Sequence, residues 1–470
     1  MSYLSVSEAR NVHDSILGAI GWTPLVRLGR VAREIAAPVY AKLEYLNPGG
    51  SVKDRVGLYI IEQAERRGEL SPGGTIVEAT SGNTGVGLAI AAALKGYKTI
   101  FVMPDKMSEE KIKLLRAYGA KVVITPTAVT PEDPRSYYEV AKRFARETPN
   151  AILANQYHNP DNPKTHELTT GPEIWEQTQG RVTDVVIGMG TGGTISGVGR
   201  YLKARNPQIR IVGVDIEGSI LKEIWENGGK VPPGVEATTY KLEGIGEDFL
   251  PSTTDLSVVD DIVRVDDKEG FLAARQLVRT EGIFAGGSSG AALAGTLKYA
   301  RRLPADRFVV TLFPDSGSRY LSKFYDNKWM RENGFLALEF GEVTLADLLA
   351  AKPVKALYTA NLGEPMREVM AAMREHAISQ MPVTGPDGKL AGTLDEVDLL
   401  NHLLEGHEHS QSETIDGLVQ HARAVFPPEA SLDEAMPMLT DGYALIVVEN
   451  GSPVGILTKI DVLEYLAGKI

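Results

Sequence analysis

The sequence contains no cysteine among its 470 residues. Disulfide bonds, thiolate metal sites, thiolate-ligated haem and a cysteine nucleophile are therefore excluded. No apolar run is long enough to span a bilayer, and the first residues, MSYLSVSEARNVHD, lack the basic-then-apolar pattern of a secretion signal. We therefore expect a cytoplasmic protein with no membrane partner.

An excess of basic residues is also missing. The chain has 49 lysines and arginines against 61 aspartates and glutamates, a net charge of −12. A protein that binds nucleic acid through its phosphate backbone needs a basic face, so we expect no nucleic-acid partner. With 43% hydrophobic and 23% charged residues, the composition is typical of a globular protein, and the length predicts two or three domains.

Up to about residue 330, apolar segments alternate with helical patterns. The clearest predicted strands are 75–79, 99–104, 121–125, 184–190, 210–215 and 307–314. Helical patterns at 85–96 and 108–119 lie between them; the second has a serine at its start and a glycine at its end. Strands without polar alternation, separated by helices, predict an α/β fold with parallel sheets. Ligands bind beyond the carboxyl ends of such strands, at strand–helix junctions.

The pattern changes near residue 335 to a connecting segment and then a duplication. Segments 364–403 and 429–466 share one order of elements: an amphipathic helix, a strand, a glycine-containing turn, a second strand and a helix that opens at aspartate. Two copies indicate a module rather than a solenoid. We expect a catalytic domain at 1–335, a linker at 336–352 and a tandem module at 353–470, divided into about 353–410 and 411–470.

The first of three glycine-rich segments is LNPGGSVKDR (46–55), which places Lys53 near the start of a helix. The positive end of the helix dipole lies there and lowers the pKa of a lysine, which suits an amine that acts as nucleophile and base. A surface lysine beside a capped helix is the simpler alternative.

The second segment, EATSGNTGVG (78–87), follows a strand and opens a helix. Its hydroxyls and backbone N–H groups at a helix N-terminus form a receptor for an anion such as a carboxylate. An ordinary capping turn needs one hydroxyl, whereas this loop has three, at Thr80, Ser81 and Thr84.

The third segment, GMGTGGTISG (188–197), is another strand–helix junction. Its glycines allow backbone amides to approach a phosphate closely. It also matches the dinucleotide fingerprint G-x-G-x-x-G at Gly188, Gly190 and Gly193, with Asp215 at the end of the next strand. The run GTGGT (190–194) is denser in glycine than a dinucleotide turn requires and fits a single terminal phosphate as well.

In this order, S-V-K-D-R, T-S-G-N-T-G and G-T-G-G-T resemble the fold type II (β-family) pyridoxal-phosphate enzymes, in particular the cysteine synthase and cystathionine β-synthase group. The resemblance covers about residues 1–335 and extends through GWTPLVRL (21–28), NQYHNPDNPKTHELTTGPEIW (155–175), LEGIGEDFLP (242–251), GGSSG (286–290) and FPDSGSRYLSKF (313–324). The duplicated tail resembles a pair of CBS domains, and this combination favours the cystathionine β-synthase branch.

The resemblance implies a role for each matching residue. Lys53 would bind pyridoxal phosphate covalently and move the substrate's α-proton, Asn83 would face the ring hydroxyl, and Ser316 would meet the pyridine nitrogen. A neutral hydroxyl at that nitrogen favours β-elimination over transamination, because it does not force the ring to be protonated. The phosphate would lie against Gly190, Thr191, Gly192, Gly193 and Thr194, and the substrate would contact Thr80, Ser81, Thr84, Gln156, Tyr157 and Glu243.

The implied activity is a lyase reaction of transsulfuration, in which L-serine and L-homocysteine give L-cystathionine. A second implied reaction releases hydrogen sulfide from cysteine. The sequence lacks the haem segment of the animal enzymes, so the resemblance implies a haem-independent enzyme of bacterial type. It also implies a homodimer or homotetramer.

Three alternatives stay open. A cysteine synthase would use O-acetylserine and sulfide. A dinucleotide-dependent oxidoreductase would leave Lys53 and the threonine loop unexplained. A non-enzymatic nucleotide sensor would not need Lys53, Asn83 and Ser316.

CBS domains commonly bind adenosyl ligands through G-h-h-[ST]-x-x-D, where h is apolar. The second copy keeps this pattern as GILTKID, with Thr458 and Asp461, whereas the first reads GTLDEVD, with Asp395 in place of the hydroxyl and Asp398 at the end. A carboxylate beside a phosphate is unfavourable, so we expect a ligand such as S-adenosylmethionine, AMP or ATP at Thr458 and Asp461. A tail that serves only dimerisation or stability is the alternative.

Overall fold

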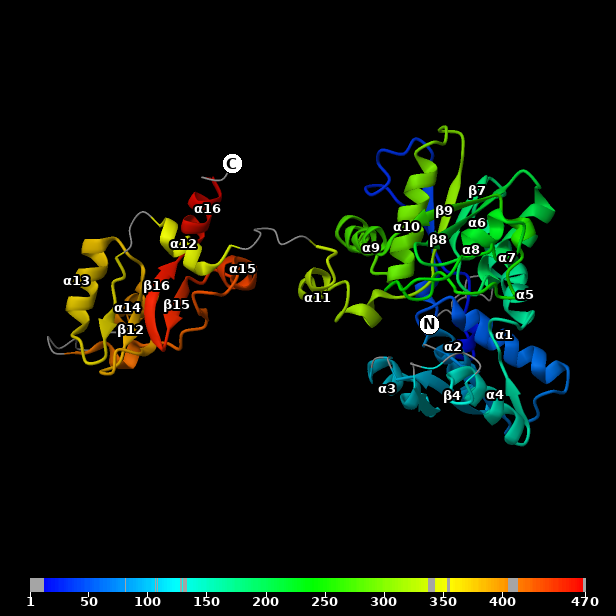
Figure 1. Ribbon diagram of the computed structural model, residues 1–470, viewed down its shortest axis with the longest axis horizontal. Helices are drawn as coiled ribbons and strands as arrows, with labels where there is room; N and C mark the ends of the chain where they lie inside the picture. Colours follow the sequence, from blue (N-terminus) through cyan, green and yellow to red (C-terminus); the bar gives the residue numbers. More distant parts are fainter. Residues whose placement is uncertain are drawn as a thin grey trace, which may run out of the picture. The chain divides into compact units, whose positions relative to one another are not determined.

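The computed structural model describes residues 12–467 except 81, 106, 108, 127–128, 130–132, 337–342, 353–355 and 405–412. Its contacts divide the chain into two compact units, residues 1–335 and 336–470 (Figure 1). Among the described residues, no helix combines the length and apolar character that crossing a membrane requires.

The first unit contains two parallel sheets. The larger has the order β1-β2-β10-β7-β8-β9, in which only β1 is antiparallel to its neighbour. Its strands are β1 (Leu25–Arg27), β2 (Val39–Leu43), β7 (Asp184–Gly188), β8 (Arg210–Ile216), β9 (Asp261–Val265) and β10 (Val309–Phe313). The smaller has the order β5-β4-β3-β6, from β3 (Thr75–Ala79), β4 (Lys98–Pro104), β5 (Lys121–Thr125) and β6 (Ala151–Leu153), all parallel.

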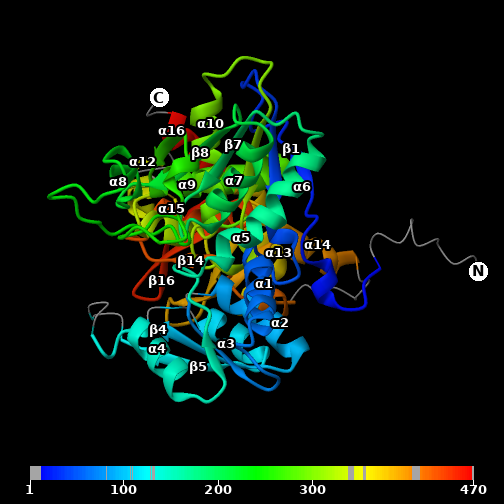
Figure 2. The ribbon, with the colours of Figure 1, turned by 90° about the vertical axis from the view of Figure 1, so that its right-hand side faces the viewer.

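The central strands are buried along their whole length because helices cover both faces of each sheet. On the small sheet, α1 (Lys53–Arg66), α2 (Asn83–Lys95) and α3 (Glu109–Ala117) pack on one face, and α4 (Tyr137–Glu147) packs on the other. Figure 2 shows this sheet and its helices at one end of the unit.

The large sheet is covered in the same way. Its core on one face comes from α6 (Thr170–Gln177), α7 (Gly193–Arg205) and α8 (Leu221–Glu226), while α10 (Gly287–Ala300) contacts four of its strands from the other face and packs on α9 (Asp267–Glu281). The remaining helices are α5 (Asp161–Leu168), α11 (Asn327–Glu332), η1 (Ile16–Ala19), η2 (Glu44–Leu46), η3 (Leu256–Val258) and η4 (Gly317–Tyr320).

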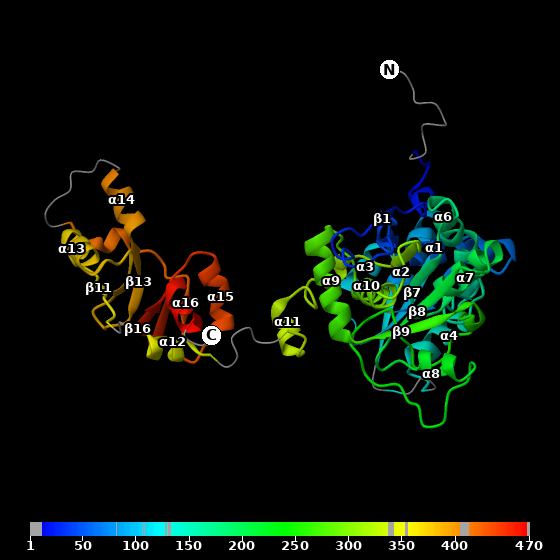
Figure 3. The ribbon, with the colours of Figure 1, turned by 90° about the horizontal axis from the view of Figure 1, so that it is seen from above.

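The second unit contains two copies of one small α/β motif, which lie next to each other in Figure 3. Each has a three-stranded sheet with one parallel and one antiparallel pairing. The first copy consists of β11 (Ala360–Asn361), α13 (Met366–His376), β12 (Gln380–Thr384), β13 (Leu390–Asp395) and α14 (Glu396–Leu404). The second consists of β14 (Val425–Phe426), α15 (Leu432–Thr440), β15 (Leu445–Glu449), β16 (Ser452–Leu457) and α16 (Lys459–Ala467), with η5 (Ile415–Leu418) between them.

The structure corrects the expected linker at 336–352. Helix α12 (Leu345–Ala351) lies in that segment, yet its buried Leu345 and Leu348 belong to the core of the second copy, beside Leu432 and Leu457. The sequence does not reveal this packing, because the partners of α12 lie more than 80 residues further along the chain. The predicted α/β fold with parallel sheets and a tandem C-terminal module is confirmed.

Candidate active site

The loop before α1 is held against the loop that follows β10. Val52 donates its backbone N–H to Pro314 O at 2.8 Å, and Ser316 donates its backbone N–H to Gly50 O at 3.1 Å. Ser51 and Asp315 form an isolated bridge between the two loops. The start of α1 and the PDSGS segment therefore form one wall of a cleft, although about 260 residues separate them.

Lys53 is the first residue of α1 and lines a cavity with the glycine-rich loop after β7. Burial lowers the pKa of its amine, while the charges of Asp315 and Glu247 act in the opposite direction. Within the described part of the chain, its Nζ has no hydrogen bond or ion pair. This amine is therefore available for a covalent bond to a ligand in the cavity.

The glycines of the glycine-rich loop, residues 190–194, have no room for side chains. Gly192 has φ +77°, and a Cβ there would lie 1.8 Å from Thr254 Oγ1, while a Cβ on Gly193 would lie 2.0 Å from Asn162 Oδ1. The loop leads into the 13-residue helix α7, so its backbone N–H groups and the helix dipole favour an anion. Among the described residues, the buried Thr254 hydroxyl has no hydrogen-bond partner, so it is a further donor beside the loop.

The threonine loop and Gln156 lie together. Thr84 donates its hydroxyl to Gln156 Oε1 at 2.5 Å, and both side chains are buried. Thr80 Oγ1 accepts hydrogen bonds from the backbone N–H groups of Gly82 and Gly85, which leaves its own proton for a ligand. Ser81 lies outside the described residues.

Asn83 and Ser316 come together through Asp315. Asn83 donates Nδ2–H to Asp315 Oδ2 at 2.9 Å, and Tyr320 donates its hydroxyl to the same oxygen at 2.7 Å. Burial raises the pKa of Asp315, although these hydrogen bonds oppose that effect. Ser316 is partly buried beside this group and lines a cavity of about 690 Å³ with Asn47, Gly82 and Lys111.

Glu243 is held by ion pairs rather than surrounded by solvent. It contacts Lys111 of α3 and Lys323, which follows η4. Burial would raise its pKa, but the two lysines outweigh burial and hold the pKa below its ordinary value. This charged triad connects the helices of the small sheet to two loops of the large one.

Three further residues of the cleft were not singled out from the sequence. They are Asp315, His166 and Glu247. His166 lies fully buried behind the glycine-rich loop, where its Nε2 is 3.3 Å from Thr194 Oγ1 and its Nδ1 is 2.9 Å from Thr170 Oγ1. Burial, with smaller contributions from Lys53 and Arg55, lowers its pKa to about 3. Its imidazole is therefore neutral and positions Thr194. All three residues lie inside motifs that carry the resemblance, but nothing in the sequence distinguishes them from structural polar residues.

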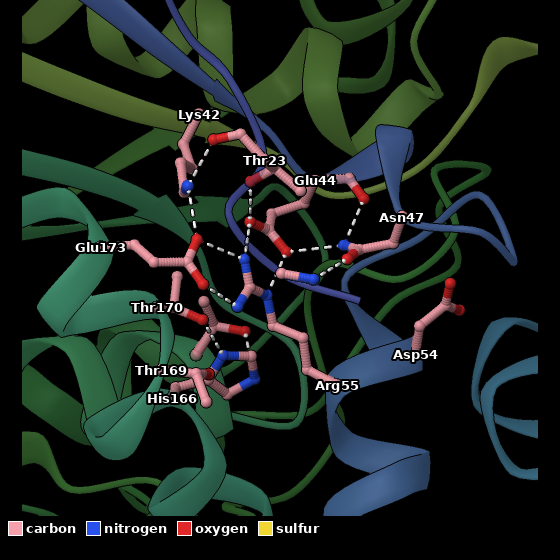
Figure 4. A network of polar contacts seen from close by, with 12 residues as sticks. Thr23, Lys42, Glu44, Asn47, Asp54, Arg55, His166, Thr169, Thr170 and Glu173 are labelled. Carbon is pink, nitrogen blue, oxygen red and sulfur yellow. Dashed lines mark hydrogen bonds and ion pairs between the residues drawn. The ribbon is translucent and has the colours of Figure 1, made fainter. Parts of the chain in front are cut away.

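A buried charge network holds α1 in place (Figure 4). Arg55 donates two hydrogen bonds to Glu44, at 2.7 and 2.8 Å, and two to Glu173, at 2.5 and 2.7 Å. Lys42 donates to Glu173 at 2.6 Å. Arg55 is two residues from Lys53, so this network fixes the helix start that presents the amine.

In the second copy of the tail, Thr458 and Asp461 contact each other. Thr458 donates its hydroxyl to Asp461 Oδ2 at 2.8 Å, and Lys352 lies 3.0 Å from Asp461 Oδ1. In the first copy, Asp395 accepts from the backbone N–H groups of Val397 and Asp398 at 2.9 Å. Burial and the charge of Asp395 raise the pKa of Asp398. The cleft of the second copy therefore contains a lysine beside its carboxylate, whereas the cleft of the first copy contains two carboxylates.

The amine of Lys53, the glycine-rich anion site and the polar loops between them define a site for a phosphate-bearing cofactor that bonds to an amine. The chain belongs to the family of pyridoxal-phosphate dependent enzymes, whose model matches residues 16–315. CBS domain models match residues 345–405 and 419–468.

Within this family, the chain is similar to cystathionine β-synthases and to cysteine synthases. The chain is 37% identical to cystathionine β-synthase of Mus musculus, over 99% of this chain and 87% of that protein. It is 46% identical to cysteine synthase of Staphylococcus aureus, over 66% of this chain and 96% of that one. A solved O-acetylserine dependent cystathionine β-synthase from Helicobacter pylori is 41% identical with a TM-score of 0.60, and the match covers 66% of this chain and 98% of that one.

Proposed function

We propose that this enzyme condenses L-serine with L-homocysteine to L-cystathionine, without haem. The observation that carries the proposal is the extent of the likeness. The match to the mouse cystathionine β-synthase runs through the tail and covers 99% of the chain, whereas the cysteine synthase matches only 66%.

The residues of the cleft fit pyridoxal phosphate. Residues 190–194 and Thr254 would hold its phosphate, Lys53 would bind it covalently, and Asn83 and Ser316 would contact its ring. When bound, the cofactor withdraws electrons from the Cα of the amino acid attached to it. Ser316 would offer a neutral hydroxyl to the ring nitrogen, which would favour loss of a β-substituent over transamination.

The chain's own side chains would then bind the substrate and transfer its protons. Thr80, Thr84 and Gln156 bind the substrate carboxylate at the N-terminus of α2, with Ser81 as a further donor. Lys53 removes the proton from Cα and later returns it, a role that suits an amine whose pKa is lowered by burial. Tyr157 and Glu243 would contact the second substrate.

The second candidate is β-replacement on O-acetylserine. The 46% identity of the catalytic half to a cysteine synthase and the 41% identity to the O-acetylserine dependent enzyme favour it. A product assay decides between the candidates: purified enzyme receives serine, cysteine or O-acetylserine, each with homocysteine or sulfide. We expect cystathionine from serine with homocysteine, and hydrogen sulfide from cysteine with homocysteine. Turnover of O-acetylserine with sulfide alone would establish the second candidate.

For the tail we propose that an adenosyl ligand binds at Thr458 and Asp461. A ligand that binds Asp461 must displace Thr458 or Lys352 from its carboxylate. If it displaces Lys352, that lysine becomes available for a phosphate oxygen. The two carboxylates at Asp395 and Asp398 make the other copy less suitable for a phosphate.

We also propose that the enzyme is a homodimer or homotetramer. Apolar side chains are more than half exposed at matching positions of α14 and α16, namely Val397, Leu400, Ile460 and Leu463. Sedimentation of the intact chain measures this state; a monomer would contradict it.

A further inference from the structure

Glu247 carries a carboxyl group beside the cleft, and the mechanism proposed above assigns it no role. It lies in the GEDF segment, three residues after Gly244, which lines the same cavity as Lys53. The charges of Lys53 and Glu247 act on each other: Glu247 opposes the lowering of the lysine's pKa, and Lys53 opposes the raising of the carboxyl group's pKa.

The backbone of Glu247 is fixed by its neighbours. Its N–H donates to Ser219 Oγ at 3.0 Å, and its carbonyl oxygen accepts from Ser219 Oγ–H and from the N–H of Ile220, both at 3.1 Å. One residue earlier, Gly246 donates its N–H to Met189 O at 2.6 Å, directly before the glycine-rich loop. The segment is thus tied to the large sheet on both sides of the side chain.

Tyr157 fixes the side chain itself, because it hydrogen-bonds to the Glu247 carboxyl group. The tyrosine is in turn held: its ring centroid lies 5.5 Å from that of Phe249, and its carbonyl oxygen accepts the hydroxyl of Thr253 at 3.1 Å. Thr253 also bonds to the carbonyl of Thr191 in the glycine-rich loop. The carboxyl group is therefore positioned relative to the site of the cofactor phosphate.

The surroundings of Glu247 favour its protonated form. Burial raises its pKa to about 8, and Asp248 and Asp215 add to this effect, whereas Lys53 and the hydrogen bond from Tyr157 oppose it. Tyr137, Tyr138 and Tyr240 also face this charge. At neutral pH the group carries a proton and can donate it.

We propose that Glu247 is the general acid that protonates the departing β-hydroxyl group of serine, and that Tyr157 positions it. This role rests on the proposed use of serine. Lys53 takes the proton from Cα, and the electrons of that C–H bond form the double bond between Cα and Cβ. The Cβ–O bond breaks, its electron pair goes to oxygen, and the proton of Glu247 joins that oxygen, so that water leaves.

The second half of the reaction restores the enzyme. The Glu247 carboxylate takes the thiol proton of homocysteine, the sulfur forms a bond to Cβ, and Lys53 returns its proton to Cα. No further reactant is needed.

The role depends on the leaving group. Hydroxide is the conjugate base of water, whose pKa is about 15.7, and it leaves readily only when it is protonated. Acetate is a carboxylate whose conjugate acid has a pKa near that of an aspartate, about 4, and it leaves without a proton. In the elimination half of the reaction, which kcat/KM for the first substrate reports, Glu247 should therefore matter for serine and much less for O-acetylserine.

The test compares Glu247→Gln with the parent on serine and on O-acetylserine, both with homocysteine. General acids contribute about 100- to 10,000-fold, so we expect kcat/KM with serine to fall at least about 100-fold and with O-acetylserine only several-fold. Glu236→Gln, the same substitution at an exposed glutamate that has no part in the proposed reaction, is the matched control and should leave the ratio of the two substrates unchanged. The parent's kcat/KM with serine should also fall above about pH 8, and this decline should be absent with O-acetylserine.

A second readout does not depend on turnover. Infrared spectra of the parent holoenzyme at pH 7 should contain the carbonyl stretch of protonated Glu247, and this component should be absent in Glu247→Gln. Equal losses with both substrates, or an unchanged carbonyl band, would overturn the role of Glu247 while leaving the proposed reaction intact. No turnover of serine by the parent would instead refute the proposed reaction and this role with it.

Discussion

Replacing Arg55 by methionine tests the charge network that holds the start of α1. Arg55 is 3% exposed and is the main partner of two buried carboxylates, Glu44 and Glu173. The substitution keeps the apolar stem and removes the charge, which leaves Glu44 ionised in a fully buried site. Breaking a buried pair from one side costs about 3–5 kcal/mol.

The pKa of Glu44 gives a similar magnitude. Burial would raise this pKa, but the charge of Arg55 and its hydrogen bonds outweigh burial and lower it from 4.5 to about 2. One pKa unit corresponds to about 1.4 kcal/mol, so the ionised form is stabilised by about 3 kcal/mol. Because the folded pKa lies below the unfolded one, this contribution is complete above about pH 4.5 and is lost as the pH falls towards 2. We therefore expect Arg55→Met to lower the free energy of unfolding by about 3–5 kcal/mol at pH 7, and by less below pH 4.5.

Denaturant unfolding followed by tryptophan fluorescence measures this effect, because all four tryptophans lie in residues 1–335 and report only the first unit. Arg66→Met, on the exposed side of the same helix, is the control and should change the free energy of unfolding by less than about 0.5 kcal/mol. The double variant with Glu44→Gln should be more stable than Arg55→Met alone, since it removes the unpaired charge. If Arg55→Met costs less than about 1 kcal/mol, or the double variant is the less stable, the network does not hold the helix as described.

Three further predictions concern the two ligand sites. Lys53→Ala should lose the visible absorbance of the bound cofactor and all turnover; a borohydride-reducible protein adduct in that variant would contradict the assignment. Ser316→Asp should retain the cofactor, lose β-replacement activity and show new long-wavelength absorbance, because a carboxylate stabilises the protonated ring; a parental rate and spectrum would show that Ser316 does not face the ring nitrogen. In calorimetry with S-adenosylmethionine, AMP and ATP, Asp461→Ala should bind at least about tenfold more weakly than the parent, whereas Asp395→Thr should bind at least as tightly; equal affinity of Asp461→Ala and the parent would make the tail a structural element.

The fold could be predicted because its buried strands have a clear signature. The run TIVEA became β3 with the expected bounds, and all five residues are buried, since helices cover both faces of the sheet. Helix α3 also lies inside its expected range, although its expected serine cap, Ser108, lies outside the described residues. Continuous apolar runs of this kind can be predicted as strands from the local sequence, without knowledge of distant contacts.

The candidate site was accessible only in part. Its glycine-rich and hydroxyl-rich loops are local patterns, so Lys53 and Thr84 could be named from the sequence, and Ser316 was named from the family resemblance. The partners that set their protonation and position come from distant segments: Glu173 lies 118 residues from Arg55, and Asp315 lies 232 residues from Asn83. Composition and spacing carry no information about such pairs.

The elevated pKa of Glu247 is a consequence of the fold in the same sense. Burial causes it, and burial of a charged residue in a polar loop cannot be read from the loop itself. In the tail, the pairing of Lys352 with Asp461 could not be anticipated for the same reason.

The most direct test of the account is a product assay with serine and homocysteine on the purified holoenzyme. The account predicts that cystathionine and water form at equal rates. It also predicts a higher turnover rate for serine with homocysteine than for O-acetylserine with sulfide. Failure to form cystathionine from serine, together with efficient formation of cysteine from O-acetylserine and sulfide, would contradict it.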